Sequence, residues 1–239
     1  MIKAILFDFG QTLVDSADGF RKAEKETQRL IFEDLGVESW PDFLSDYRKF
    51  RQDFHARSNF SRKDFWQAIY AHYDQKSDDE MLLRMELEYW ELIKTLTKPF
   101  PETQMVLAQL ASEYRLGLIT NTQGQHTPDQ HRLSLFPEIE KFFEFIIVAG
   151  ENGIPPKPAS KPFIIGLEKL GISPSEAIYV GDDWRNDICG AKEVGIQPLW
   201  LQHYSVTRKW PTIETQVPVL VSLEQLPKWL SSNQVSMMD

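Results

Sequence analysis

The chain has 239 residues and a formal net charge of −9, with 42% hydrophobic and 26% charged residues. This length and composition predict a globular protein of one large or two small domains, with enough apolar residues for a sizeable core. The acidic excess argues against a nucleic-acid or anionic-membrane surface, because binding to phosphate backbones needs clustered Lys and Arg.

The first predicted element is a strand over residues 2–7, a short run of mostly branched and aromatic residues. Asp8 follows directly and is therefore expected at the carboxyl end of a buried parallel strand. Ligands bind at that edge in open α/β sheets, so a carboxylate there is available for chemistry. An Asp that only caps a turn fits the same segment equally well.

Helical spacing then continues to about residue 98. Helices are predicted over residues 19–35, 40–57, 62–73 and 77–96, and Ser77 is expected to cap the last of them reciprocally with Glu80. These helices predict an all-helical domain over residues 16–98, inserted after the first strand.

One aromatic run and one basic segment of this insertion have two possible roles. The aromatic side chains are expected to form the core of the helical domain rather than a substrate platform; they are Phe60, Phe65, Trp66 and Tyr70. The basic segment over residues 57–63 is expected to be a solvated loop, with a specificity residue above an active site as the alternative.

Strands and helices alternate in the rest of the chain. Residues 98–102 are predicted to be the return linker, with Pro101 in the first turn of the next helix. Strands are predicted over residues 116–120, 145–148, 177–180, 197–201 and 219–221. Helices are predicted over residues 102–113, 129–135, 161–170 and 185–194, with a last helix ending near residue 231. This alternation predicts a doubly wound parallel sheet, with residues 1–15 and 99–239 as an α/β core domain.

The single cysteine, Cys189, makes an internal disulfide impossible and fits a reducing compartment. We expect Cys189 to be a small buried residue on a helix facing the sheet. The sequence contains no run approaching the roughly 18 apolar residues of a membrane span, and its first apolar run is too short for a signal peptide. These features predict a cytoplasmic protein.

Polar residues at four predicted strand ends would converge at one edge of the sheet. They are Asp8, Thr120 with Asn121, Lys157, and Asp182 with Asp183 and Asp187. A carboxylate can attack phosphorus, Mg2+ prefers oxygen ligands, and lysine offsets charge on a transferring group. The set therefore suits metal-assisted phosphoryl transfer, and Lys161 is an alternative to Lys157.

These segments, in this order, resemble the motifs of the haloacid dehalogenase (HAD)-like hydrolase superfamily, in its phosphatase branch with a helical cap after the first strand. Asp8-Phe9-Gly10-Gln11-Thr12 resembles the first motif and residues 118–121 the second. Lys157-Pro158 resembles the third motif and residues 181–187 the fourth. The resemblance covers nearly the whole chain and implies a Rossmann-like core.

The resemblance also implies roles for individual residues. Asp8 would be the nucleophile, Thr120 would hydrogen-bond the transferring phosphoryl group, and Lys157 would stabilise the phospho-aspartate. Asn121 would line the substrate. Mg2+ would be held by Asp8, by the backbone carbonyl of Gly10 and by Asp182. Asp187 and Asp183 would not bind the ion directly but would surround and orient its ligands.

Gly10 departs from the family pattern, which usually has an Asp there as general acid and base. General acid–base catalysis contributes roughly 100- to 10,000-fold, so its loss predicts slow turnover without loss of nucleophilic attack or metal binding. Substrates with acidic leaving groups should suffer least. Asp15 and His55 are candidates for supplying the missing proton transfer.

The resulting prediction is a Mg2+-dependent phosphatase of a small phosphorylated metabolite, acting as a monomer or homodimer. One alternative is a metal-free 2-haloacid dehalogenase, which the acidic residues at positions 182, 183 and 187 disfavour. A second alternative is a catalytically weakened member that binds a phosphometabolite or a protein. Gly10 supports this alternative, whereas the retained Asp8 and Lys157 oppose it.

Overall fold

The computed structural model describes residues 1–124 and 131–235, with side chains up to residue 233. Contacts divide the chain into two compact units. One unit contains Met1–Asp15, Lys98–Asn121 and the described chain from Arg132 onward. The other contains Ser16–Thr97, with residues 122–124 and 131 grouped with it.

The first unit is built on a six-stranded sheet in the order β5-β4-β1-β6-β7-β8, and every neighbouring pair is parallel. This arrangement confirms the predicted parallel α/β sheet. Its strands are β1 (Ala4–Phe7), β4 (Arg115–Asn121), β5 (Phe145–Ala149), β6 (Ala177–Gly181), β7 (Gln197–Leu201) and β8 (Val219–Leu220).

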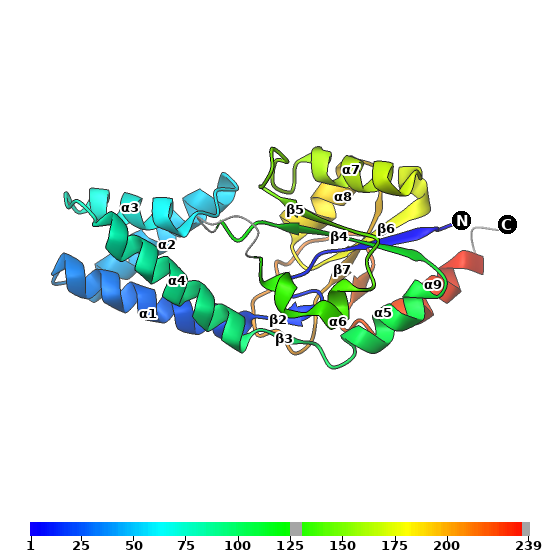
Figure 1. Cartoon of the computed structure of the whole chain (residues 1–239), viewed down its shortest axis with the longest axis horizontal. Coiled ribbons are helices and arrows are strands. Elements are labelled where there is room, and N and C mark those ends of the chain that lie inside the picture. Colours follow the sequence, from blue (N-terminus) through cyan, green and yellow to red (C-terminus); the bar gives the residue numbers. More distant parts are fainter. Residues whose placement is uncertain (125–130, 236–239) are drawn as a thin grey trace. The chain divides into compact units, whose positions relative to one another are not determined.

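Helices cover both faces of this sheet (Figure 1). On one face lie α5 (Thr103–Ala111), α6 (Pro137–Glu140) and α9 (Gln225–Val235), and on the other lie α7 (Ser160–Leu170) and α8 (Gly190–Glu193). Alternate residues of β1 contribute to different cores: Ile5 and Phe7 to the first, Leu6 to the second. Burial on both faces explains why this strand is a continuous apolar run rather than an alternating pattern.

Strands β2 (Val14–Asp15) and β3 (Lys98–Pro99) pair as a short antiparallel ribbon. Strand β2 ends the first segment of the first unit, and β3 begins its second segment. The sequence analysis did not predict this ribbon. Two-residue strands carry too short a pattern to recognise. Helix α5 begins at Thr103, so the prediction that Pro101 lies in its first turn was wrong. Thr103 instead donates its hydroxyl to the Leu13 carbonyl at 2.8 Å, which fixes the start of the helix beside the ribbon.

The second unit is all-helical, with α1 (Ala17–Leu35), α2 (Trp40–Ala56), α3 (Arg62–His72) and α4 (Asp79–Leu96) around one apolar core. These bounds lie within two residues of the predicted ones. The predicted Ser77 cap was wrong, because the Asp78 carboxylate accepts a hydrogen bond from the Met81 amide at 2.8 Å. A carboxylate at a helix start also interacts favourably with the helix dipole.

The predicted aromatic core is confirmed for Phe65, Trp66 and Tyr70, which are buried in the helical core, whereas Phe60 is only partly buried and does not belong to it. The prediction of a solvated segment over residues 57–63 was wrong for Arg62. This side chain is buried at the start of α3, 3.6 Å from the Glu24 carboxylate, with its guanidinium 5.0 Å from the centre of the Tyr89 ring. A buried carboxylate contributed by a distant helix was not visible in the local pattern.

Two predicted helices of the first unit take other forms. Of residues 129–135, the first two lie outside the described residues, and Arg132–Leu135 forms a short 3-10 helix. Residues 185–194 form a π-helix, Trp184–Cys189, followed by α8. The expected burial of Cys189 was wrong, because its side chain is exposed. A π-helix has wider turns than an α-helix, so the helical register used for the prediction does not hold.

None of the helices within residues 1–124 and 131–235 combines the length and apolarity that crossing a bilayer requires.

Candidate active site

Asp8 and Lys157 form the centre of a buried polar cluster in the first unit. Asp8 directly follows β1, and its backbone amide donates to the Val180 carbonyl at 2.9 Å, continuing the sheet pattern. The Lys157 ammonium donates to Asp8 Oδ1 at 2.8 Å. The alternative lysine, Lys161, is exposed and donates to the Gly153 carbonyl instead. The structure therefore brings Lys157, and not Lys161, to the predicted nucleophile.

Lys157 has further partners on the π-helix and on strands β4 and β6. Its ammonium lies 2.6 Å from Asp187 Oδ1, 2.9 Å from the Ile119 carbonyl and 2.9 Å from the Tyr179 hydroxyl. Burial opposes the charge on Lys157, but attraction to Asp187 and Asp8 outweighs it and raises the pKa of the ammonium well above its usual value. Lys157 therefore stays protonated and fixed in place.

Tyr179 is a member of this cluster that the sequence analysis missed. It is fully buried in β6, where its hydroxyl donates to the Ile119 carbonyl at 2.8 Å and receives the Lys157 ammonium. Burial raises the pKa of this phenol well above its usual value, so it remains neutral. The only sequence signal was a tyrosine among the small and aliphatic residues of a central strand.

Asn121 holds the backbone on which Lys157 is mounted. Its side-chain carbonyl accepts from the Lys157 amide at 2.7 Å, and its side-chain NH2 donates to the Lys157 carbonyl at 3.2 Å. Both ends of the Asn121 amide are thus used to position Lys157. Thr120 precedes it, buried in β4 and opposite Val148 of β5.

Asp187 is positioned by the π-helix. Its Oδ1 faces Lys157, and its Oδ2 accepts from the Asp183 amide at 2.9 Å. Burial raises the pKa of the Asp187 carboxyl to about 7, with Lys157 acting in the opposite direction. The Asp183 carboxylate caps the π-helix by accepting from the Asn186 amide at 2.7 Å. One π-turn therefore presents Asp187 to the cluster, in keeping with the frequent occurrence of π-turns at functional sites.

Asp182 is held by a residue from a distant loop. Its Oδ2 receives Arg208 Nη1 at 2.6 Å, and its backbone carbonyl receives Arg208 Nη2 at 3.1 Å and Trp200 Nε1 at 2.9 Å. Burial raises the pKa of the Asp182 carboxyl, and Arg208 partly offsets this effect. The Arg208 guanidinium also lies 4.0 Å from the centre of the Trp210 ring. No motif marks Arg208, so the sequence analysis missed it.

Three carboxylates of the cluster could hold a cation. Asp8, Asp182 and Asp187 are all buried, and one oxygen from each lies within 4.8 Å of the others. Oxygen ligands of this kind suit a hard cation such as Mg2+. Three buried carboxylates with one buried lysine also leave an excess of negative charge, which a divalent cation would offset. The donor set thus fits the expected metal.

The place of a side chain at Gly10 is taken by Arg132. A Cβ atom built on Gly10 would lie 2.6 Å from Arg132 Nη2, closer than real Cβ contacts allow. The Arg132 guanidinium also lies over the Phe9 ring, 5.4 Å from its centre, and the side chain is buried. Gly10 therefore admits a guanidinium two residues after Asp8. This contact joins distant parts of the sequence, so no local pattern revealed it.

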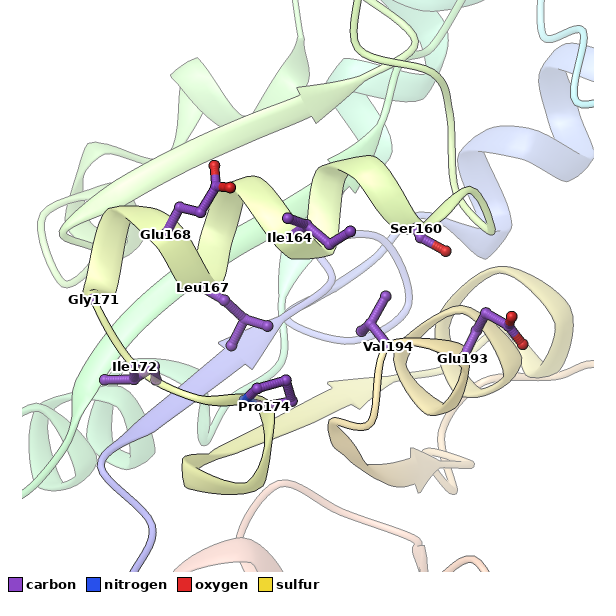
Figure 2. A pocket seen from close by; sticks show the side chains of 9 residues that line it. All are labelled: Ser160, Ile164, Leu167, Glu168, Gly171, Ile172, Pro174, Glu193 and Val194. Atoms are coloured by element: carbon purple, nitrogen blue, oxygen red, sulfur yellow. The ribbon is translucent and has the colours of Figure 1, made fainter.

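An apolar groove of about 470 Å³ lies elsewhere on the first unit. Figure 2 shows Ile164 and Leu167 of α7 on one side and Pro174 and Val194 on the other. Its lining contains no member of the carboxylate cluster. The polar cluster at the strand ends is therefore the better candidate for chemistry.

A protein-family model described as haloacid dehalogenase-like hydrolase matches residues 2–195. The glyceraldehyde 3-phosphate phosphatase of Methanocaldococcus jannaschii is 30% identical over 200 residues, which cover 82% of this chain and 83% of that protein.

Two solved structures are similar over almost their whole length. A 2-haloacid dehalogenase from Pseudomonas syringae pv. Tomato has a TM-score of 0.64 and 26% identity, covering 97% of this chain and 99% of that chain. A HAD phosphatase from Thermococcus onnurineus has a TM-score of 0.66 and 24% identity, covering 96% and 98%. At this identity, the second likeness bears on the fold alone.

Proposed function

This chain belongs to the haloacid dehalogenase-like hydrolases, and from that membership we propose that it is a Mg2+-dependent phosphatase of a small phosphorylated metabolite. The proposal agrees with the activity named for the archaeal relative, a glyceraldehyde 3-phosphate phosphatase. The observation that carries it is the buried contact of 2.8 Å between Asp8 Oδ1 and the Lys157 ammonium, beside two further carboxylates.

Asp8 is the proposed nucleophile. Its carboxylate attacks phosphorus, a bond forms between an Asp8 oxygen and phosphorus, and the bond to the leaving oxygen breaks with its electron pair. Water then attacks the aspartyl phosphate, which releases inorganic phosphate and restores the carboxylate. The Lys157 ammonium offsets negative charge during both steps, and Thr120 hydrogen-bonds the transferring group.

The proposed metal ligands are the Asp8 and Asp182 carboxylates and the Gly10 carbonyl, with Asp187 orienting the cluster through Lys157. When bound, Mg2+ supplies positive charge that lowers repulsion between the carboxylate and the anionic substrate. Gly10 provides no proton donor for the leaving oxygen. We therefore propose slow turnover of esters whose leaving group needs a proton.

Metal-free dehalogenation is the second enzyme candidate, because a similar structure carries that name. The cluster of Asp8, Asp182 and Asp187 disfavours it, since a metal-free reaction has no use for three buried carboxylates around one site. A binding protein without turnover is disfavoured by the buried pairing of Asp8 with Lys157.

The experiment is phosphate release from para-nitrophenyl phosphate, with Mg2+ and with chelator, by wild type, Asp8→Asn and the exposed control Asp53→Asn. We expect chelator-sensitive release by wild type and the control, and a loss of more than about 1,000-fold in Asp8→Asn. Equal release by wild type and Asp8→Asn would disprove the proposal. Chloride release from 2-chloropropionate with chelator present would favour the dehalogenase instead.

A further inference from the structure

The contact between Gly10 and Arg132 bears on which leaving groups the proposed active site can stabilise. The guanidinium of Arg132 fills the space where a side chain of residue 10 would project, with Nη2 2.6 Å from the position of a Cβ atom. Gly10 lies two residues after Asp8 and forms a bridge with Val14 where the chain leaves β1. A permanent positive charge therefore lies against Gly10, two residues after the proposed nucleophile in the sequence.

We propose that Arg132 binds the leaving group and that the enzyme favours substrates whose leaving group departs as an anion, namely acyl phosphates and phosphoanhydrides. This inference rests on the proposed phosphatase function and names the substrate class of the same site. Its basis is the position of the guanidinium in place of a side chain at Gly10.

The chemistry of arginine determines this preference. A guanidinium stays protonated at any physiological pH, so it cannot give its proton to a leaving alkoxide. It can hydrogen-bond and neutralise an oxygen anion, and its planar donors match carboxylate and phosphate. When Asp8 attacks an acyl phosphate, the bond between phosphorus and the bridging oxygen breaks and both electrons stay on the carboxylate. This step needs no proton, and water then hydrolyses the phospho-aspartate.

The surroundings of Arg132 strengthen such an interaction. The side chain is only 7% exposed, so its charge acts in a medium of lower dielectric than water. Its guanidinium lies 5.4 Å from the centre of the Phe9 ring, an arrangement that orients the planar group. Phe9 lies between Asp8 and Gly10 in the sequence, so one short segment carries the nucleophile, the ring and the space that Arg132 occupies.

Gly10 is the partner that makes this position possible. Any Cβ at residue 10 would require the end of the Arg132 side chain to move. Gly10→Ala therefore displaces the guanidinium without removing its charge and without introducing a new polar group. Arg132→Met removes the charge but keeps a long side chain, and Arg132→Lys keeps a charge without the planar fork.

The test compares kcat/KM for acetyl phosphate and for glycerol 1-phosphate in wild type and these three variants, with Mg2+ present. We expect wild type to favour acetyl phosphate. In Arg132→Met the ratio of kcat/KM for acetyl phosphate to kcat/KM for glycerol 1-phosphate should fall by at least about tenfold. The fall should come mainly from kcat for acetyl phosphate, because the negative charge on the leaving group develops in the transition state. Gly10→Ala should lower the ratio in the same direction, and Arg132→Lys should be intermediate.

An unchanged ratio in Arg132→Met, or equal losses for both substrates, would overturn the inference. If Arg132→Met does not fold, the ratio in Gly10→Ala decides alone. The Asp8→Asn variant distinguishes a failure of the leaving-group inference from a failure of the proposed phosphatase function. Hydrolysis that Asp8→Asn abolishes, with a ratio that does not depend on Arg132, would contradict only the leaving-group assignment. Hydrolysis unaffected by Asp8→Asn would contradict the phosphatase itself.

Discussion

Each of the two units contains a buried charge cluster with tyrosines, and the clusters have opposite composition. In the α/β unit a cation, Lys157, is flanked by the carboxylates of Asp8 and Asp187. In the helical unit a buried carboxylate, Glu24, lies 3.6 Å from the buried guanidinium of Arg62 and 3.6 Å from that of Arg51, whose side chain is exposed.

The helical cluster satisfies its carboxylate on both oxygens. Tyr89 donates to Glu24 Oε1 at 3.0 Å, and Tyr47 donates to Oε2 at 2.9 Å. Burial opposes the charge on Glu24, but the two arginines and the hydroxyls outweigh it and lower the pKa of the carboxyl. Such a cluster holds helices together and has no evident need of a ligand.

The α/β cluster has more negative than positive charge. Asp182 adds a third buried carboxylate to Asp8 and Asp187, and Arg208, which pairs with Asp182, is one-third exposed. Further positive charge nearby would stabilise an arrangement of this kind in its ionised form. The comparison teaches that the sign of the unbalanced charge, rather than burial itself, separates a candidate metal site from a structural network.

Removing the central cation is expected to have the largest effect. Lys157→Met leaves Asp8 and Asp187 facing each other without their buried partner, and breaking such a pair costs about 3–5 kcal/mol of unfolding free energy. Urea unfolding measures this difference, with the exposed Lys161→Met as control. A loss below about 1 kcal/mol would show that the carboxylates become protonated or solvated at little cost.

Adding Mg2+ should stabilise the folded protein through the carboxylates of the α/β cluster, and not through the helical cluster. At a concentration 100 times its dissociation constant, a ligand that binds only the folded state contributes about 2.7 kcal/mol to the unfolding free energy. Thermal unfolding with and without Mg2+ should show this gain in wild type and Glu24→Gln, and not in Asp182→Asn. An equal gain in Asp182→Asn would place the ion away from the carboxylates.

The two clusters differ in how far the sequence predicts them. Asp8, Lys157, Asp182 and Asp187 each follow a strand, and parallel strands bring their carboxyl ends to one edge, so pattern and topology predict their meeting. The helical cluster depends on Glu24, which lies within a helix and looks like any solvated acidic residue. Its partner Arg62 was accordingly expected to be in solvent.

Contacts made by irregular segments escaped prediction for a similar reason. Arg132 and Arg208 reach the site from a short 3-10 helix and a loop, where no periodicity fixes the direction of a side chain. The exposed Cys189 was missed because a π-turn is not encoded by a recognisable hydrophobic period. The long helices and the strands of the main sheet were thus predictable, whereas helix caps and side chains from loops were not.

Glu24→Gln should destabilise the helical cluster by about 1–3 kcal/mol at pH 7, since hydrogen bonds to a charged group are lost. Because folding lowers the pKa of Glu24, its charge stabilises the fold above the usual carboxyl pKa of 4.5. That contribution declines as the pH falls through the lowered pKa. Urea unfolding of both proteins at pH 7 and pH 3 should therefore show a smaller difference at pH 3. A pH-independent difference would mean that packing, not charge, is responsible.

The smallest expected effect concerns Arg208, which shares the Asp182 carboxylate with the proposed metal. Two cations near one carboxylate repel each other, so Arg208→Ala should tighten Mg2+ binding at pH 8. The gain should be about twofold to fivefold, because a partly exposed ion pair contributes about 0.2–1 kcal/mol. Calorimetric titration with Mg2+ measures it, and Arg208→Lys, which keeps the charge, should resemble wild type. Weaker Mg2+ binding in Arg208→Ala would mean that Arg208 supports binding of the ion instead of opposing it. The hydrogen bonds from Arg208 to the carboxylate and to the backbone carbonyl of Asp182 would then orient this residue for the ion, and the charge excess of the cluster would count for less than its geometry.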